Sequence, residues 1–205
     1  MAAENKVQFN LKNVHYAILT LSGDTPTYGT PVHVPGAVSL AMEQSGNTTS
    51  FYADGIRYYT AQSNTGYNGD LEMARFPDQM MQDIWRHVLA ETDLVAVENC
   101  EINPADFALL FQIDGDKQSR DVVMYNCSGT RPAVSGETTD ENKEPKTQSS
   151  TITASALPNG NVMAYTTANT PDTIRNGWFN KVYLPDETTQ AKIKAKIDGT
   201  ETQEA

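Results

Sequence analysis

The sequence contains little of what most catalytic and metal-binding sites use. Among 205 residues there are only two cysteines and three histidines, and the spacings of Cys-x-x-Cys, His-Glu-x-x-His, Gly-x-Ser-x-Gly and the phosphate-binding loop are all missing. No stretch approaches the roughly 18 consecutive apolar residues that a membrane-spanning helix requires. These absences argue against a membrane protein, a zinc module, a metalloprotease and a nucleotide-binding loop, so we expect no metal and no cofactor.

Positive charge is also scarce. Fifteen Lys and Arg residues face 26 Asp and Glu residues, which gives a formal net charge of −11. A nucleic-acid binder needs a basic patch to hold phosphates, so the composition argues against one. An acidic wall can still let DNA pass without binding it, because it repels the duplex. Soluble cytoplasmic proteins are often acidic as well, and composition alone favours that ordinary explanation.

The polar start of the chain and the two cysteines lead to one expectation. Met1–Lys6 is polar and lacks a basic region followed by an apolar one, so we expect no signal peptide and a cytoplasmic protein. Disulfides are rare in a reducing cytoplasm. We therefore expect Cys100 and Cys127 to be free, buried thiols.

Alternating apolar and polar residues dominate the chain and predict strands. Turn-prone residues at 114–116 predict a hairpin between two of them, and Asn159-Gly160 supplies the positive φ angles of a tight reverse turn between two others. The pattern favours a mainly β fold of two packed antiparallel sheets, a sandwich or half-barrel with long loops. The predicted strands are 14–19, 38–42, 107–113, 121–127, 151–157 and 162–167.

The sharpest hairpin signal lies at 50–59. Asp54-Gly55 suits a two-residue type I′ turn, whose twist matches that of the paired strands. This turn predicts that Ala53 faces Ile56, Tyr52 faces Arg57 and Phe51 faces Tyr58. Aromatic pairs across strands each stabilise a sheet by roughly 0.2–1 kcal/mol.

One apolar stripe has helical period and predicts a single flanking helix. Pro77 suits the first helical position, and Asp78 places negative charge near the positive end of the helix dipole. We expect the helix to run from about Pro77 to about Ala90 and to close one face of the sheets. The stripe consists of Met81, Ile84, Trp85, Val88 and Leu89.

Three segments lack a regular pattern. Leu21–Pro35 is rich in Pro and Gly, and Gly129–Ser149 is rich in Gly, Pro, Thr and charge, so both are expected to be long loops. Residues 186–205 are polar, with alternating lysines, and are expected to form a flexible tail. We therefore predict one β domain over 1–185, followed by that tail.

The order of three motifs resembles a known family. An aromatic-Tyr-Ala-Asp hairpin at 51–54, Gly-Asp-Leu-Glu at 69–72 and Phe-Pro-Asp at 76–78 occur in this order in the phi13-type major tail proteins of long-tailed bacteriophages. The similarity extends more loosely from 14–19 to 178–184. Tyr-Ala-Asp alone is common, and it is the order and spacing of several motifs that carries the resemblance.

The resemblance implies a structural virion protein, without enzymatic activity, in the phage tail. Six subunits would form a ring, and rings would stack into a non-contractile tube through which DNA passes without specific binding. It further implies tape-measure and tail terminator or initiator proteins as partners, and assembly in the host cytoplasm. Some relatives carry an immunoglobulin-like domain after this point, which we expect this chain to lack.

Within that family the assembly contacts would come from the hairpin and the long loops. Phe51 and Tyr52 are expected in sheet core or in contacts between subunits. Tyr28 is expected either to anchor a contact between rings or to pack within its own loop. Trp85 is expected in the core, and Trp178 and Phe179 are expected to anchor a last strand. The predicted assembly residues are Tyr28, Pro31, Phe51, Tyr52, Arg131, Glu137, Asp140 and Glu141.

Two other functions remain open on the sequence. A β-sandwich binding module that recognises carbohydrate or a receptor would suit loops rich in Asn, Thr and Tyr. A hydrolytic enzyme could be assembled from scattered carboxylates, although loop carboxylates such as those at 137–144 are usually just solvated.

Overall fold

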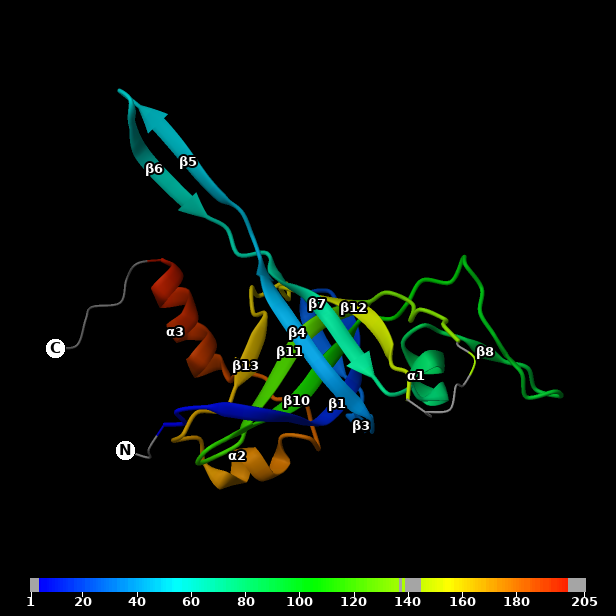
Figure 1. Ribbon diagram of the computed structural model, residues 1–205. Coiled ribbons are helices and arrows are strands. Elements are labelled where there is room, and N and C mark those ends of the chain that lie inside the picture. The colour runs from blue at the N-terminus through cyan, green and yellow to red at the C-terminus, as the bar shows by residue number, and fades with distance from the viewer. Residues whose placement is uncertain (1–3, 137, 139–144, 199–205) are drawn as a thin grey trace.

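The computed structural model describes residues 4–136, 138 and 145–198. It is mainly β (45% strand, 12% helical), which confirms the predicted fold class. Nine strands form one large antiparallel sheet: β1 (Gln8–Ser22), β2 (Thr25–Tyr28), β3 (Val32–His33), β4 (Ala37–Ser45), β7 (Gly66–Met73), β10 (Phe107–Gly115), β11 (Arg120–Gly129), β12 (Gln148–Ser155) and β13 (Met163–Tyr165). Its order is β2-β1-β10-β11-β12-β7-β4, with β3 on β1 and β13 on β11 (Figure 1).

This sheet curls, so the predicted sandwich or half-barrel takes the half-barrel form. A single buried cluster joins Val14 and Tyr16 of β1 to Leu71 and Met73 of β7, near the other end of the sheet. The central strands fill the same cluster with every second residue of β10, as the alternation predicts; these are Phe107, Leu109 and Phe111.

The opposite face of the sheet has its own core. Ala108 and Leu110 of β10 alternate with the first set and pack with Tyr125 of β11. The chain covers this face after β13 with Trp178 and Val182, so both faces of β10 are buried.

The predicted last strand around Trp178 and Phe179 is absent from the described residues. A short helix, α2 (Asp172–Gly177), ends there instead, and Trp178 is its C-cap residue. The indole stacks on Tyr183, with ring centroids 5.5 Å apart. Trp178 therefore anchors an irregular segment, not a strand.

The predicted helix begins where expected but ends early. Pro77 is the N-cap of α1 (Asp78–Asp83), which is six residues long. The backbone N–H of Ala105 donates to the Ile84 carbonyl at 2.7 Å, and Arg86 adopts a positive φ of 55°, so tertiary bonds override the helical period. Trp85 is still core, at 1% exposure.

Beyond α1 the chain forms a small hairpin where helix was expected. Its strands are β8 (Val88–Leu89) and β9 (Ala96–Val97). Val88 and Leu89 are exposed, and they do not continue the buried stripe. Helical period over 81–89 was therefore misleading past Trp85.

The hairpin at 50–59 is confirmed as β5 (Thr48–Ala53) and β6 (Ile56–Gln62). Asp54 and Gly55 have φ angles of 53° and 76°, as a type I′ turn requires. Ala53 pairs with Ile56 and Tyr52 with Arg57. The third pair was predicted wrongly, since an irregularity after Tyr52 places Phe51 opposite Tyr59.

Three further expectations are modified. Residues 187–197 of the expected flexible tail form a helix, α3 (Glu187–Ile197), whose N-cap Asp186 accepts from the Thr189 N–H at 2.8 Å. The expected loop at 21–35 contains β2 and β3. The turn at 158–161 exists, but β12 and β13 do not pair with each other because both pair with β11.

No helix among the described residues is long and apolar enough to span a membrane.

Both cysteines are free, and only one is buried. Cys127 is 0% exposed, and burial raises the pKa of its thiol to about 12, whereas Cys100 is exposed. Because the thiolate is the reactive form, we expect the folded protein to react with one equivalent of a thiol reagent at pH 8, at Cys100. Unfolding in guanidinium should release the second equivalent, and rapid reaction of Cys127 in the folded protein would contradict this.

Candidate assembly surfaces

The β5–β6 hairpin extends the β4–β7 pair beyond the body of the molecule (Figure 1). The ladder ends at Ser45 opposite Gly66 and resumes at Thr48 opposite Gln62. Two backbone bonds bridge the break: the Thr65 N–H donates to the Ser45 carbonyl at 2.8 Å, and the Ser63 N–H donates to the Asn47 carbonyl at 2.9 Å. The hairpin is thus one continuous ribbon with the central sheet.

The two strands at the break approach too closely for a side chain at Gly46. A Cβ built there would lie 2.0 Å from the Ser63 carbonyl oxygen. Only glycine fits where another backbone passes so near.

The hairpin carries a large apolar surface and belongs to neither of the two buried clusters that the described residues form. Five of its large aromatic and aliphatic side chains are 59–72% exposed. Isolated two-stranded hairpins are only marginally stable in water, and large exposed apolar patches mark interaction sites. These five apolar residues are Phe51, Tyr52, Ile56, Tyr58 and Tyr59.

An apolar groove of about 440 Å³ opens at the mouth of the half-barrel. We call it the barrel-mouth groove. Arg120 stands at its rim with its guanidinium carbon 4.9 Å from the centre of the Tyr165 ring. Its apolar wall consists of Leu40, Met42, Tyr67, Phe111, Ile113, Val122, Met124 and Met163. Methionine side chains adapt to irregular partners, so this wall suits an apolar ligand or protein segment.

The β4 strand forms an edge of the sheet beside this groove. It is the last strand in the sheet order and pairs only with β7 among the described residues. An edge strand offers unpaired backbone groups to another chain. Besides apolar packing in the groove, the central sheet can therefore pair the backbone of β4 with another chain.

A second arm leaves the body after α1. We define the β8–β9 arm as residues 88–104. Its turn is closed by the Ala90 N–H donating to the Val95 carbonyl at 2.8 Å. Arg131 fixes its base: the guanidinium donates to the carbonyls of Asn99 and Ile102 at 3.1 and 3.0 Å and pairs with the Glu98 carboxylate.

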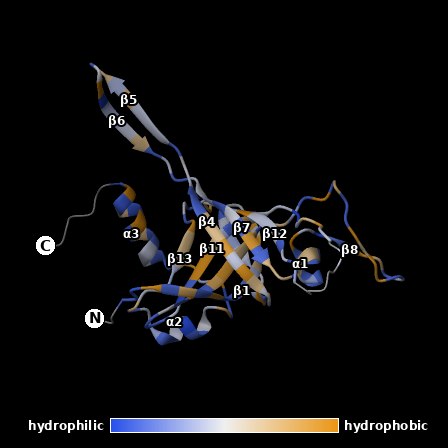
Figure 2. Cartoon of the chain, viewed as in Figure 1, coloured by the Kyte–Doolittle hydropathy of each residue, from blue (hydrophilic) through white to orange (hydrophobic). Residues whose placement is uncertain are grey.

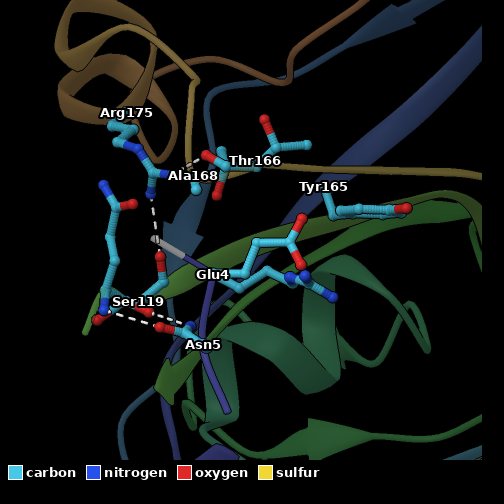
Figure 3. A pocket seen from close by; sticks show the side chains of 10 residues that line it. Glu4, Asn5, Ser119, Tyr165, Thr166, Ala168 and Arg175 are labelled. Atoms are coloured by element: carbon cyan, nitrogen blue, oxygen red, sulfur yellow. Dashed lines mark hydrogen bonds between the residues drawn. The ribbon is translucent and has the colours of Figure 1, made fainter. Parts of the chain in front are cut away.

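A polar pocket of about 220 Å³ lies between the β10–β11 turn and the segment after β13 (Figure 3). The Arg175 guanidinium donates to the backbone carbonyls of Ser119 at 3.0 Å, Thr170 at 3.3 Å and Thr167. It also lies 3.8 Å from the buried Asp121 carboxylate. Because backbone carbonyls occupy this guanidinium, the arginine ties loops together and is not presented to a ligand.

Asp121 in that cluster has the environment of a structural carboxyl. It is 3% exposed, and the Gln112 amide donates to it at 2.7 Å. Burial raises its pKa above the ordinary value, while the Gln112 bond and the Arg175 charge oppose the rise. Glu4 is the one carboxylate among the described residues that line the pocket, and Asp121 does not line it. The arrangement therefore does not resemble an acid–base pair.

The remaining titratable groups do not form a metal site. No group of three or more His, Cys, Asp or Glu side chains suited to a metal occurs in the part of the chain that the structure describes. His15 of β1 and His33 of β3 lie side by side: their ring centroids are 4.9 Å apart because β1 pairs with β3. Phe179 stacks on the other side of His15 at 4.7 Å, and burial lowers the His15 pKa.

The predicted assembly residues lie in separate places. Phe51 and Tyr52 are on the projecting hairpin, and Arg131 fixes the base of the β8–β9 arm. Tyr28 is half-buried, and its hydroxyl donates to the Tyr125 carbonyl at 3.0 Å; Pro31 lies half-buried just before β3. Three predicted residues, Glu137, Asp140 and Glu141, fall outside the described residues.

Sequence reasoning missed the arm itself. Its aliphatic residues were assigned to helix or left unassigned, and the only signal was an acidic stretch, 88–104, with no Lys or Arg. That acidic stretch, interrupted by short Val and Leu pairs, could have indicated a solvent-exposed segment in place of a helix.

Comparison with known proteins gives no family. No protein-family model matches the chain, and no curated protein sequence matches it either. Among solved structures, a sheath/tube terminator of an extracellular contractile injection system (PVC) overlaps with a TM-score of 0.44 at 10% identity, covering 76% of this chain and 94% of that one. The tube-terminating cap of the anti-feeding prophage overlaps with a TM-score of 0.41 at 13% identity, covering 80% and 96%. Overlaps this loose leave the function of this chain to be argued from its own residues.

Proposed function

We propose that the chain is a structural subunit of a phage-type tail tube. It assembles with itself into hexameric rings, and the rings stack into a tube that conducts DNA. The observation that carries this proposal is the β5–β6 hairpin, which projects from the sheet with five large apolar side chains exposed. Such a surface is stabilised only when another molecule covers it.

The rest of the molecule supplies a receptor of matching chemistry. The barrel-mouth groove is apolar, adaptable and open to solvent, and the edge of β4 runs beside it. A hairpin from a neighbouring copy can pack its aromatic residues on the groove and pair its backbone with the edge. Contacts between two different surfaces of identical subunits are head-to-tail and close into a ring when the rotation permits.

Three further features agree with a tube. The motif order at 51–54, 69–72 and 76–78 resembles the major tail proteins. The net charge of −11 suits a wall that must not bind DNA. The mainly β fold, with one large antiparallel sheet, is what the resemblance implies.

The proposal is tested by polar substitution of the hairpin. Combining Phe51→Ser, Tyr52→Ser and Tyr59→Ser should leave the fold intact, because these side chains make no contact with the buried clusters. We expect wild-type protein at high concentration to form rings or hollow tubes by electron microscopy, and the triple variant to form none.

Val7→Ser is the matched control, since it removes an apolar side chain of 50% exposure outside the hairpin and should leave assembly unchanged. Normal rings from the triple variant, with its circular dichroism and thermal transition unchanged, would reject the hairpin as the contact. A persistent wild-type monomer that binds glycans on an array would instead favour a β-sandwich binding module.

A further inference from the structure

We propose that the β8–β9 arm docks into a groove beside Trp178 on a second copy of this chain. This contact deepens the proposed function, on which its biological role rests, because stacked rings need an interface besides the one within a ring. It uses surfaces that the hairpin does not, so the two contacts can be tested separately.

The arm has the composition of an insertion element. Val88 pairs with Val97 on one face and Leu89 with Ala96 on the other, so the small hairpin is apolar on both sides. Its apolar side chains are exposed, with Leu94 at 69% and Val95 at 57%; in Figure 2 hydrophobic stretches alternate with hydrophilic ones along the arm. A hairpin with two apolar faces has no core of its own and must bury them elsewhere.

Hydrogen bonds and an ion pair fix the base of the arm to the body. Arg131 binds two backbone carbonyls and Glu98 there, and the Ala105 N–H bonds to Ile84 at the return to the sheet. Pre-organisation of this kind lowers the entropy lost on binding. Arg131 is therefore a positioning residue for the arm.

A groove of about 300 Å³ runs beside Trp178 between α2 and the start of α3. Ile174, Val182 and Leu184 give it apolar walls, and Lys181 stands on its rim. Trp178 is 3% exposed, and its indole N–H has no hydrogen-bond partner within the described residues. A buried donor without an acceptor is costly, so the indole side chain is a sensitive reporter of any change in the groove that it lines.

The charges of the two surfaces are complementary. The arm carries Glu91, Asp93, Glu98 and Glu101 and no Lys or Arg. Lys181 is the charged residue among the described residues that line the groove, and none of them is a carboxylate, although Asp172 and Asp186 flank this segment in the sequence. In a chain with a net charge of −11, copies repel one another generally, so the Lys181 ammonium on the groove rim favours the approach of the acidic arm at this place.

The contact must join two copies. The β8–β9 arm and α2 lie on opposite sides of the body (Figure 1), so an arm cannot reach the groove of its own chain. A contact between unlike surfaces repeats from copy to copy and suits stacking.

A charge exchange between arm and groove tests the proposal by sedimentation velocity. Two full-length variants are compared in the hairpin triple-substituted background, which removes the hairpin contact. One carries Lys181→Glu, and the other carries Glu91→Lys with Asp93→Lys. We expect each alone to self-associate at least about tenfold more weakly than the background protein at low ionic strength, and an equimolar mixture to recover association between the two. Unchanged association of the single variants, or no recovery in the mixture, would overturn the proposal.

A second experiment measures the environment of Trp178, which lines the groove. The chain has two tryptophans, and Trp85 already donates to Gly129 and Thr130, so its ¹⁹F resonance in 5-fluorotryptophan protein serves as an internal reference. We expect only the Trp178 resonance to shift as the concentration rises, and Val95→Ser with Val97→Ser to abolish that shift. An unshifted Trp178 resonance during association would place the contact elsewhere. Because hairpin variants are already in the background, failure here leaves the ring-forming role of the hairpin untouched.

Discussion

Trp85→Ala is expected to lower the free energy of unfolding by about 3–5 kcal/mol, the usual cost of deleting a buried tryptophan side chain. The indole is 1% exposed and packs edge-on against Phe76, with ring centroids 5.4 Å apart. Its N–H donates to the carbonyls of Gly129 and Thr130 at 3.1 and 3.0 Å. The substitution leaves a cavity under α1 and removes a link between α1 and the end of β11.

Urea unfolding monitored by Trp178 fluorescence measures this loss. Trp85→Phe retains most of the volume but not the N–H, so it should cost less than Trp85→Ala. Tyr58→Ala is the surface control: the side chain is 72% exposed, and removing it should change stability by no more than about 0.5 kcal/mol. A loss below about 1 kcal/mol for Trp85→Ala would show that the residue is not part of the folding core.

Gly66→Ala and Gly69→Ala are each expected to lower the free energy of unfolding at least as much, by about 4 kcal/mol or more. A Cβ at Gly66 would lie 1.9 Å from the Ala154 carbonyl oxygen, in a residue whose φ is +121°. A Cβ at Gly69 would lie 1.8 Å from the Ala41 carbonyl oxygen. Since both obstacles are backbone of neighbouring strands, each alanine must push β7 away from β12 or from β4.

Gly55→Ala separates backbone strain from steric overlap. Gly55 also has a positive φ, +76°, but nothing lies within 4 Å of its Cβ position. We expect Gly55→Ala to lower the free energy of unfolding by only about 1 kcal/mol. Hydrogen exchange should show faster exchange of β4 or β12 amides in the Gly66 and Gly69 variants and not in Gly55→Ala; equal costs for all three glycines would contradict the steric explanation.

The strands and their buried faces were predictable because their causes are local. Asp54-Gly55 dictates the hairpin turn, and alternation in 107–113 places Phe107 and Leu109 on one face. The end of α1 was not predictable, because it depends on a bond from Ala105, twenty-one residues beyond Ile84. The pairing of both β12 and β13 with β11 depends likewise on how distant strands meet.

The candidate assembly surfaces were likewise predictable only where their cause is local. Phe51 and Tyr52 were identified because their turn fixes where they lie. The β8–β9 arm was not, because its Val and Leu residues fit a helical period as well as a strand. Only tertiary structure shows that Val88 and Leu89 face solvent.

The continuity of the β5–β6 hairpin with the β4–β7 ladder has a mechanical consequence. A pull on the hairpin along its strands draws β4 and β7 together, so it loads in shear the bonds that join β7 to β12, from Gln148–Met73 to Ala154–Tyr67, because those bonds lie across the strand direction. Bonds loaded in shear share the force, whereas bonds loaded at one end of a ladder open one after another. Tension applied at the hairpin therefore reaches the middle of the sheet instead of peeling its edge.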